Sequence, residues 1–159
     1  MKRLIILLCI ATALVSCGES NNNAKVQTAD IAFTKEGELT LAKVSGEDIV
    51  TLDIEFAETD YEIQTGLMYR KSMKENQAML FIFPYSRPQS FYMKNTYIPL
   101  DIIYLDENKK IVSFQENAEP LNEAGLPSEV PAMYVLEVNA GLAEKWLLEI
   151  GDTATFVKF

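Results

Sequence analysis

Histidine is absent from this 159-residue sequence, and only two residues are cysteine. Without histidine the chain lacks the commonest general base and metal ligand, so neither a Ser-His-Asp triad nor a Cys-His pair can form within it. Basic residues are also scarce, with 14 lysines and arginines against 23 acidic residues, a formal charge of −9. Because nucleic-acid binding normally needs a basic face, the composition argues against that class.

What the chain does have is enough apolar material for one folded domain. Hydrophobic residues make up 48% of the sequence and aromatic residues 10%, which excludes wholesale disorder. A length of 159 residues suits a single domain. The acidic residues show no calcium-loop spacing. We predict neither a metal nor a cofactor.

The amino terminus has the anatomy of a lipoprotein signal peptide. Lys2 and Arg3 supply a positive start, and residues 4–15 form an apolar run too short for an ordinary membrane span. The run ends in Leu-Val-Ser-Cys, which resembles a bacterial lipobox with cleavage before Cys17. We therefore predict a signal peptide over residues 1–16 and lipid attachment at Cys17. The alternative is a plain secretory signal followed by an incidental cysteine.

Lipidation of Cys17 has consequences for the mature protein. Residues 17–35 become the lipidated cysteine and a flexible, asparagine-rich tether. Loss of Lys2 and Arg3 lowers the 14 basic residues to 12 against 23 acidic ones, a formal charge of −11. Such a surface does not favour anionic lipid, so membrane attachment rests on the lipid chains. The predicted location is the cell envelope, facing the periplasm or the cell exterior.

Short apolar and alternating segments predict a mainly β domain over residues 36–159. Residues 50–56 alternate strictly between apolar and polar, as a half-buried strand does, and residues 78–83 form an unbroken apolar run. The proline-rich residues 117–131 predict a loop. The expected strands are residues 38–44, 50–56, 78–83, 89–94, 100–105, 110–115, 132–138 and 153–159.

Two short helices complete the predicted fold. Thr59 and Glu62 have the spacing of a capping box, and Gly66 marks a close backbone approach or the end of the helix. Residues 140–150 carry apolar residues at fourfold spacing and are followed by Gly151, which is typical of a helix with a glycine cap. Without regular β-α alternation, we predict a compact antiparallel β-barrel or sandwich of about eight strands with two short helices.

Five polar residues stand where the fold has no evident need of them. Arg70 could clamp an anionic ligand, or form a structural salt bridge with Asp101 or Glu137. Lys94 and Asn95, with Thr96, could form a polar pocket floor for an anionic or sugar-like ligand. Alternatively, Asn95 and Thr96 bond the turn backbone while Lys94 faces water.

The remaining two of these residues lie among apolar neighbours. A carboxyl group at Asp101 could have a raised pKa and act as a general acid or base, or it could be the partner of Arg70 or Lys94. Glu137 on a core strand could complete the same network. The candidate ligand-binding residues are therefore Arg70, Lys94, Asn95, Asp101 and Glu137, and no residue is assigned as catalytic.

Several segments stand in an order that matches a known pattern: residues 66–70, 79–83, 91–96, 99–103, 134–141 and 151–152. Together they resemble the bacterial and archaeal domain of unknown function 192 family. The resemblance covers about residues 50–157 and implies a small β-rich, barrel-like, often exported domain without an established activity. This chain has Ala78 where the family pattern usually has glycine, and Tyr92 where it usually has tryptophan.

The sequence thus predicts an uncharacterised envelope lipoprotein that binds a small anionic or glycan ligand through a polar pocket, rather than an enzyme. One alternative is a hydrolase or lyase using Asp101 with Lys94. Another is an assembly partner in an envelope protein complex, which an exposed apolar patch beside residues 117–131 would favour.

Overall fold

The computed structural model describes residues 30–159. The predicted signal peptide, Cys17 and the tether as far as residue 29 lie outside the described residues, so lipidation stays a prediction. Over residues 30–159, no helix combines the length and the apolar character that a membrane span requires.

Strands dominate the described part of the chain. In chain order the elements are β1 (Gly37–Ala42), β2 (Asp48–Ala57), α1 (Asp60–Thr65), β3 (Gln77–Phe91), β4 (Leu100–Leu105), β5 (Ile111–Ala118), β6 (Leu126–Asn139), α2 (Leu142–Lys145) and β7 (Thr153–Lys158).

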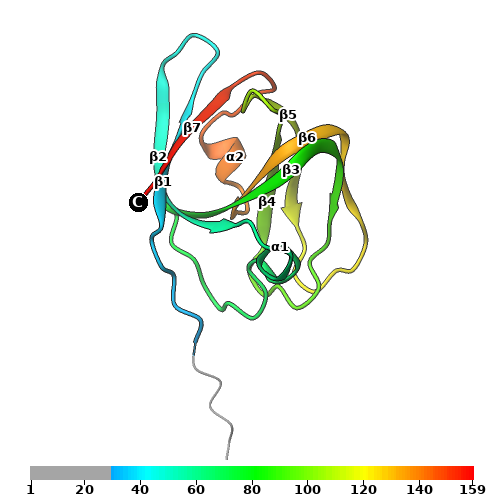
Figure 1. Ribbon diagram of the computed structural model, residues 1–159. Helices are drawn as coiled ribbons and strands as arrows, with labels where there is room; N and C mark the ends of the chain where they lie inside the picture. The colour runs from blue at the N-terminus through cyan, green and yellow to red at the C-terminus, as the bar shows by residue number, and fades with distance from the viewer. Residues whose placement is uncertain (1–29) are drawn as a thin grey trace, which may run out of the picture.

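The strands form one curled sheet in the order β5-β4-β6-β3-β2-β1-β7 (Figure 1). All neighbouring pairs are antiparallel except β2 and β3, which are parallel. The edge strands approach each other at a single bridge between Lys110 and Thr153, so the sheet is a half-barrel rather than a closed barrel. The predicted mainly β fold with two short helices is confirmed. The described residues do not confirm an eighth strand, a closed barrel or a wholly antiparallel sheet.

The merger of two expected strands explains the strand count. The two strands expected at residues 78–83 and 89–94 are one strand, β3, because Pro84 and Pro88 lie where its pairing with β6 is irregular. Pro88 is opposite Pro131, and neither has an N–H to leave unpaired. β6 therefore begins within the region predicted to be a loop.

The second predicted helix is also shorter than expected. α2 covers only Leu142–Lys145, and Leu147 just beyond it has a φ of +53°, which a continuing helix does not allow. Gly151, with a φ of +100°, lies in the turn before β7 rather than at the end of the helix.

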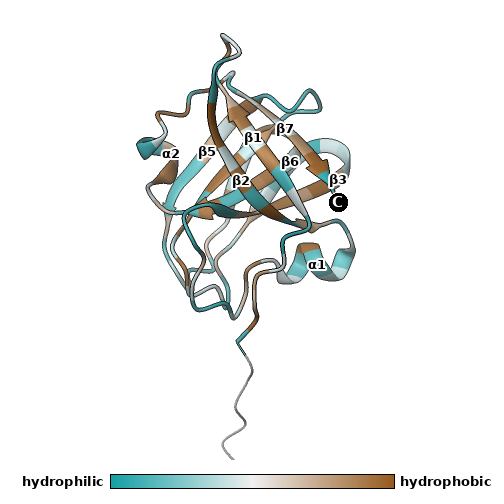
Figure 2. Cartoon of the chain, turned by 90° about the vertical axis from the view of Figure 1, so that its left-hand side faces the viewer, coloured by the Kyte–Doolittle hydropathy of each residue, from teal (hydrophilic) through white to brown (hydrophobic). Residues whose placement is uncertain are grey.

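Apolar residues cover both faces of the central strands. Along β3, β4 and β6, alternate side chains join one of two clusters: Leu80, Ile103 and Leu136 pack in the first, Phe81 and Tyr104 in the second. β4 is buried at every position, as expected of a strand covered on both sides. Figure 2 shows hydrophobic residues following the strands, whereas α1 is mostly hydrophilic. α1 has no fully buried residue and packs against the second cluster through the half-buried Ile63.

The two ends of α1 match the sequence prediction. The Thr59 side chain accepts the Glu62 N–H, and the Glu62 carboxylate accepts the Thr59 N–H, forming the capping box. Gly66 ends the helix with φ +45° and ψ −128°, and a Cβ atom there would stand 2.9 Å from the Phe81 ring. Both readings of Gly66 are therefore confirmed: it ends the helix, and it allows the backbone to approach β3.

Gly66→Ala tests this close approach. We expect it to lower the free energy of unfolding more than Gly46→Ala, by about 1 to 3 kcal/mol, because it adds a clash with Phe81 to the cost of a positive φ. Gly46 is the matched control, since its φ is +88° and a Cβ atom there would meet nothing within 4 Å. Urea unfolding followed by circular dichroism measures both variants. Equal losses would show that the Phe81 contact is unimportant.

Candidate functional site

Asp101 is a structural carboxylate that holds two chain segments together. It lies on β4 and is 1% exposed. Its Oδ1 accepts the Asn117 N–H at 2.8 Å, and its Oδ2 accepts the Ala143 N–H at 2.9 Å. It therefore caps α2, whose preceding residue, Gly141, offers no side chain. Neither Arg70 nor Lys94 pairs with it, so that predicted pairing is wrong.

Lys94 and Asn95 lie in the loop between β3 and β4, on the outside of the domain. The Lys94 side chain is 51% exposed, with its Nζ 3.9 Å from Glu123 Oε2. Asn95 has a φ of +56°; its carbonyl accepts the Tyr69 N–H at 2.8 Å, and its Nδ2 donates to Tyr69 Oη at 2.9 Å. Asn95 thus joins this loop to the turn after α1.

Arg70 forms a buried ion pair with Glu55, a residue that the sequence analysis did not single out. The two residues are 8% and 6% exposed, and Arg70 Nη2 lies 2.6 Å from Glu55 Oε2. The atoms are not aligned as a hydrogen bond, so the contact is ionic, and Arg70 Nε has no acceptor among residues 30–159. The predicted structural salt bridge exists, but its partner is Glu55 rather than Asp101 or Glu137. Glu55 Oε1 also accepts the Thr34 N–H at 2.8 Å.

Glu137 is a second buried carboxyl group in the same row of the sheet. Met79 on β3 is opposite both Glu55 on β2 and Glu137 on β6. Two strand spacings place the Glu55 and Glu137 backbones about 10 Å apart. Glu137 is 6% exposed, and burial raises the pKa of its carboxyl group from 4.5 to about 8. No hydrogen bond or ion pair within the described chain offsets this burial. The group is therefore mostly protonated at neutral pH.

The Glu137 carboxyl group lines a pocket of about 270 Å³, here called the Glu137 pocket. Its walls come from the end of α1, from the aromatic second half of β3 and from Thr96. The buried Gln89 contributes an amide whose Nε2 donates to the Ala132 carbonyl at 3.3 Å, and Arg87 stands exposed at the mouth. The lining residues are Ile63, Gln64, Thr65, Gly66, Leu67, Met68, Phe81, Phe83, Arg87, Gln89, Ser90, Phe91, Tyr92, Thr96 and Glu137.

A second cavity of about 340 Å³ adjoins the first and contains Arg70. The residues after α1, including Gly66 and Met68, line both spaces and form the wall between them. The structure therefore divides the five predicted residues: Glu137 and Arg70 line neighbouring cavities, Asp101 lies on the other face of the sheet, and Lys94 and Asn95 lie outside. Glu55 and Gln89 could have been noticed in the sequence, because both are polar residues within expected strands. Nothing in the sequence indicated which residues they contact.

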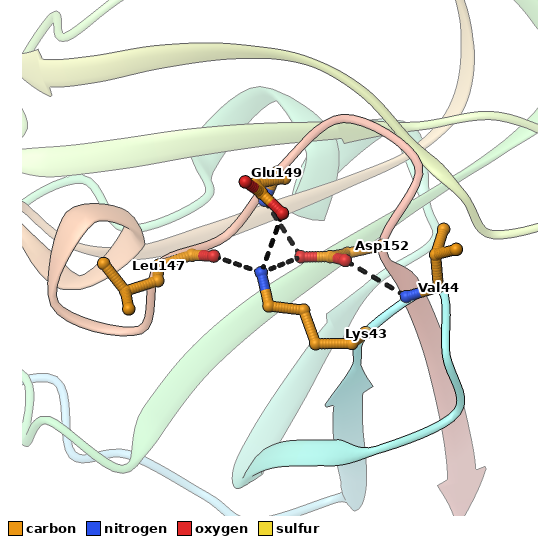
Figure 3. Close-up of polar contacts among 5 residues, drawn as sticks. All are labelled: Lys43, Val44, Leu147, Glu149 and Asp152. Atoms are coloured by element: carbon orange, nitrogen blue, oxygen red, sulfur yellow. Dashed lines mark hydrogen bonds and ion pairs between the residues drawn. The ribbon is translucent and has the colours of Figure 1, made fainter.

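Another buried carboxylate, Asp152, joins the β1–β2 turn to the residues before β7, and Figure 3 shows its contacts. Its Oδ2 accepts from Lys43 Nζ at 3.0 Å and from the Glu149 N–H at 2.9 Å, and its Oδ1 accepts the Val44 N–H at 3.2 Å. Burial by itself raises the pKa of Asp152, but these hydrogen bonds outweigh it and the pKa is lowered. Asp152 is therefore an ionised structural group that ties the β1–β2 turn to the residues before β7. Within residues 30–159, no cluster of three or more acidic or cysteine residues could hold a metal ion.

Arg70→Met tests the buried ion pair. It leaves the Glu55 carboxylate without its cation and is expected to lower the free energy of unfolding by about 3 to 5 kcal/mol. Adding Glu55→Gln removes the stranded charge and should restore at least half of that loss. Lys71→Met is the control: Lys71 pairs with Asp30 on the surface, where a loss below about 1 kcal/mol is expected. A double variant no more stable than Arg70→Met would contradict the ionic account.

The raised pKa of Glu137 predicts a pH dependence of stability. Between about pH 4.5 and pH 8 the unfolded chain loses this proton and the folded chain keeps it, so stability falls as pH rises. The total loss is roughly 5 kcal/mol at 1.36 kcal/mol per unit. Glu137→Gln removes the titrating group. Between pH 4.5 and pH 9 the free energy of unfolding of this variant should therefore rise, relative to that of the wild type, by roughly 5 kcal/mol. Urea unfolding across this range, with the exposed Glu116→Gln as control, measures the difference. If the free energy of unfolding varied with pH in the same way for the wild type and Glu137→Gln, the predicted pH dependence would be refuted.

Comparisons with known proteins place the chain in a family. It matches the model of the DUF192 family, described as "Uncharacterized ACR", over residues 40–156. It is similar to a crystal structure from Sinorhizobium meliloti 1021 whose name proposes a transcription regulator, with 35% identity, a TM-score of 0.74, and coverage of 80% of this chain and 97% of that one. It is also similar to a protein of unknown function from Novosphingobium aromaticivorans, with 33% identity, a TM-score of 0.70, and coverage of 74% and 83%. No curated protein gives a significant match. This chain therefore belongs to the DUF192 family, whose function is uncharacterised.

Proposed function

We propose that this protein is a lipoprotein of the cell envelope whose domain binds a small, neutral, hydroxyl-rich ligand, such as a sugar or the end of a glycan, in the Glu137 pocket. The lipid on Cys17 would hold the domain at the membrane. The proposal for the envelope rests on the signal-peptide anatomy of residues 1–16 and on the residues around Cys17.

The observation that carries the binding proposal is the Glu137 carboxyl group at the wall of a pocket, buried and without a partner among the described residues. A buried polar group without a hydrogen bond is costly. A bound hydroxyl group can offset that cost, because a protonated carboxyl offers one donor and further acceptor sites. The Glu137 carboxyl group is therefore available to a ligand that enters the pocket.

The rest of the pocket narrows the ligand class. Phe91 and Tyr92 present aromatic surface, and Gln89 and Thr96 present an amide and a hydroxyl group. Sugars combine apolar C–H surface with hydroxyl groups, so they match a mostly apolar wall with a few placed polar groups. A volume of about 270 Å³ lies just below the range of roughly 300 to 1,000 Å³ typical of larger ligands, which favours a single ring. The exposed Arg87 at the mouth would favour an acidic substituent outside the pocket.

The hydrolase or lyase alternative and a role in transcription receive less support. Asp101 uses both carboxylate oxygens on backbone N–H groups, and Lys94 points to the outer loop, so the hydrolase or lyase reading of these two residues has no shared site. The transcription role in the name of the Sinorhizobium protein is not extended to this chain, because a formal charge of −9 disfavours nucleic-acid binding.

Thermal denaturation of the mature protein with a panel of sugars tests the proposal. The panel holds neutral hexoses, N-acetylated hexosamines, uronic acids and, as a comparison, simple carboxylic acids. We expect a neutral sugar to raise the melting temperature, since a ligand at 100 times its Kd stabilises a protein by about 2.7 kcal/mol, or several degrees. Glu137→Leu should abolish the response. Glu137→Gln should keep it and extend it above pH 8, where the wild-type carboxyl ionises.

Exposed Glu116→Gln is the control and should respond like the wild type. If only the acidic compounds raised the melting temperature, the neutral-ligand proposal would be wrong, and the ligand would be an anion bound through Arg87. A wild type that responds to no sugar, or a Glu137→Leu variant that still folds and responds fully, would overturn the proposal.

A further inference from the structure

One end of the domain carries a continuous group of exposed aromatic and aliphatic side chains. Ile31, Tyr61, Tyr69, Tyr97 and Leu121 are 49%, 76%, 51%, 48% and 58% exposed, and together they are called the tyrosine face. Single exposed apolar residues need no explanation, but adjoining ones do.

Contacts within the structure show that these residues adjoin. Ile31, Tyr61 and Tyr69 line the same cavity beside α1. The Tyr69 and Tyr97 rings meet edge to face with centroids 6.4 Å apart. The Leu121 N–H donates to the Thr96 carbonyl, next to Tyr97. Four chain segments that are distant in sequence therefore build one surface at the α1 end of the domain, the lower end in Figure 1.

The described chain also begins at this end. Asp30 forms an ion pair with Lys71, Ile31 lies beside Tyr61 and Tyr69, and the Thr34 N–H donates to Glu55. The chain that leads back to Cys17 thus leaves the domain at the tyrosine face. The intervening residues span at most about 45 Å even when fully extended. A lipid on Cys17 would therefore be joined to the domain at the tyrosine face, which places this face within reach of the membrane.

We propose that the tyrosine face lies in the headgroup layer of the membrane that holds the lipid anchor. Tyrosine suits that layer, since its ring enters the apolar boundary while its hydroxyl group stays hydrated. The neighbouring acidic residues Asp60, Glu119 and Glu123 are exposed, so zwitterionic lipids match this face better than anionic ones. The lipid supplies the attachment, and the tyrosine face would set the orientation of the domain on the membrane. This inference rests on the lipid anchor of the proposed function.

The absence of a thiol in the domain makes a direct test possible, because a single introduced cysteine can carry a nitroxide label. The lipidated protein is incorporated into phosphatidylcholine and phosphatidylethanolamine vesicles. One label is placed at the exposed Ala124, three residues from Leu121, and another at the exposed Ser45 in the distant β1–β2 turn. Electron paramagnetic resonance then measures the collision of each label with a water-soluble relaxant and with oxygen.

We expect the Ala124 label to be shielded from the water-soluble relaxant several-fold more than the Ser45 label. A triple Tyr61→Ser, Tyr97→Ser, Leu121→Ser variant should lose this shielding while remaining on the vesicles through its lipid. The control triple Val44→Ser, Tyr85→Ser, Ile150→Ser changes exposed apolar side chains outside the tyrosine face and should keep the shielding.

Three results would overturn the inference. Equal accessibility of the two labels on vesicles would show that the face stays in water. Shielding that requires added envelope protein, and is absent on pure lipid, would make the partner a protein. A wild type that fails to float with vesicles would remove the anchor itself, leaving the sugar-binding proposal to stand on its own thermal test.

Discussion

The parallel pairing of β2 with β3 is the constraint on which the candidate site depends. Two parallel neighbours cannot be joined by a tight turn, so the chain must cross from one end of the sheet to the other. The crossover consists of residues 58–76, which contain α1, Gly66 and Arg70. These residues form the wall between the two cavities, and Gly66 lets that wall approach Phe81 closely. In an all-antiparallel sheet a short hairpin would replace the crossover, and the Glu137 pocket would lose one side.

Glu55 and Glu137 show how two carboxyl groups in one row of a sheet can have different surroundings. Both are buried and both are opposite Met79, but the crossover brings Arg70 only to Glu55. Glu55 therefore has a cation against which its charge is balanced, whereas burial raises the pKa of Glu137 to about 8. The charged pair fixes the crossover, and the protonated group faces the cavity. The position of a single arginine thus separates a structural carboxylate from a candidate binding group.

Local patterns predicted much of the fold, because they depend on neighbours in sequence. The capping box of α1, the special role of Gly66 and the alternation of β2 follow from backbone geometry and residue type. Long-range pairing was not predictable: nothing in a linear pattern distinguishes Glu55 from Asp101 as the partner of Arg70. The same limit explains why residues 78–83 and 89–94 were expected to be separate strands, and why residues 117–131 were expected to be a loop. Pro88 and Pro131 are tolerated because each is opposite the other across the β3–β6 pair, and that register is set by the whole sheet. Of the five candidate ligand-binding residues, the structure brings only Arg70 and Glu137 to neighbouring cavities.

The contact between the two edge strands has a consequence for a protein crowded on a surface. Open sheet edges invite pairing between molecules, and attachment to a membrane raises the local concentration of a protein by confining it to two dimensions. Here the residues around the starts of β5 and β7 exchange backbone hydrogen bonds: the Ile111 N–H donates to the Asp152 carbonyl, the Gly151 N–H to the Ile111 carbonyl, and the Ala154 N–H to the Lys109 carbonyl. The same corner is secured by Asp152 and Lys43. Part of each edge is therefore already paired within the molecule, which limits edge-to-edge aggregation under the crowding that a lipid anchor would impose.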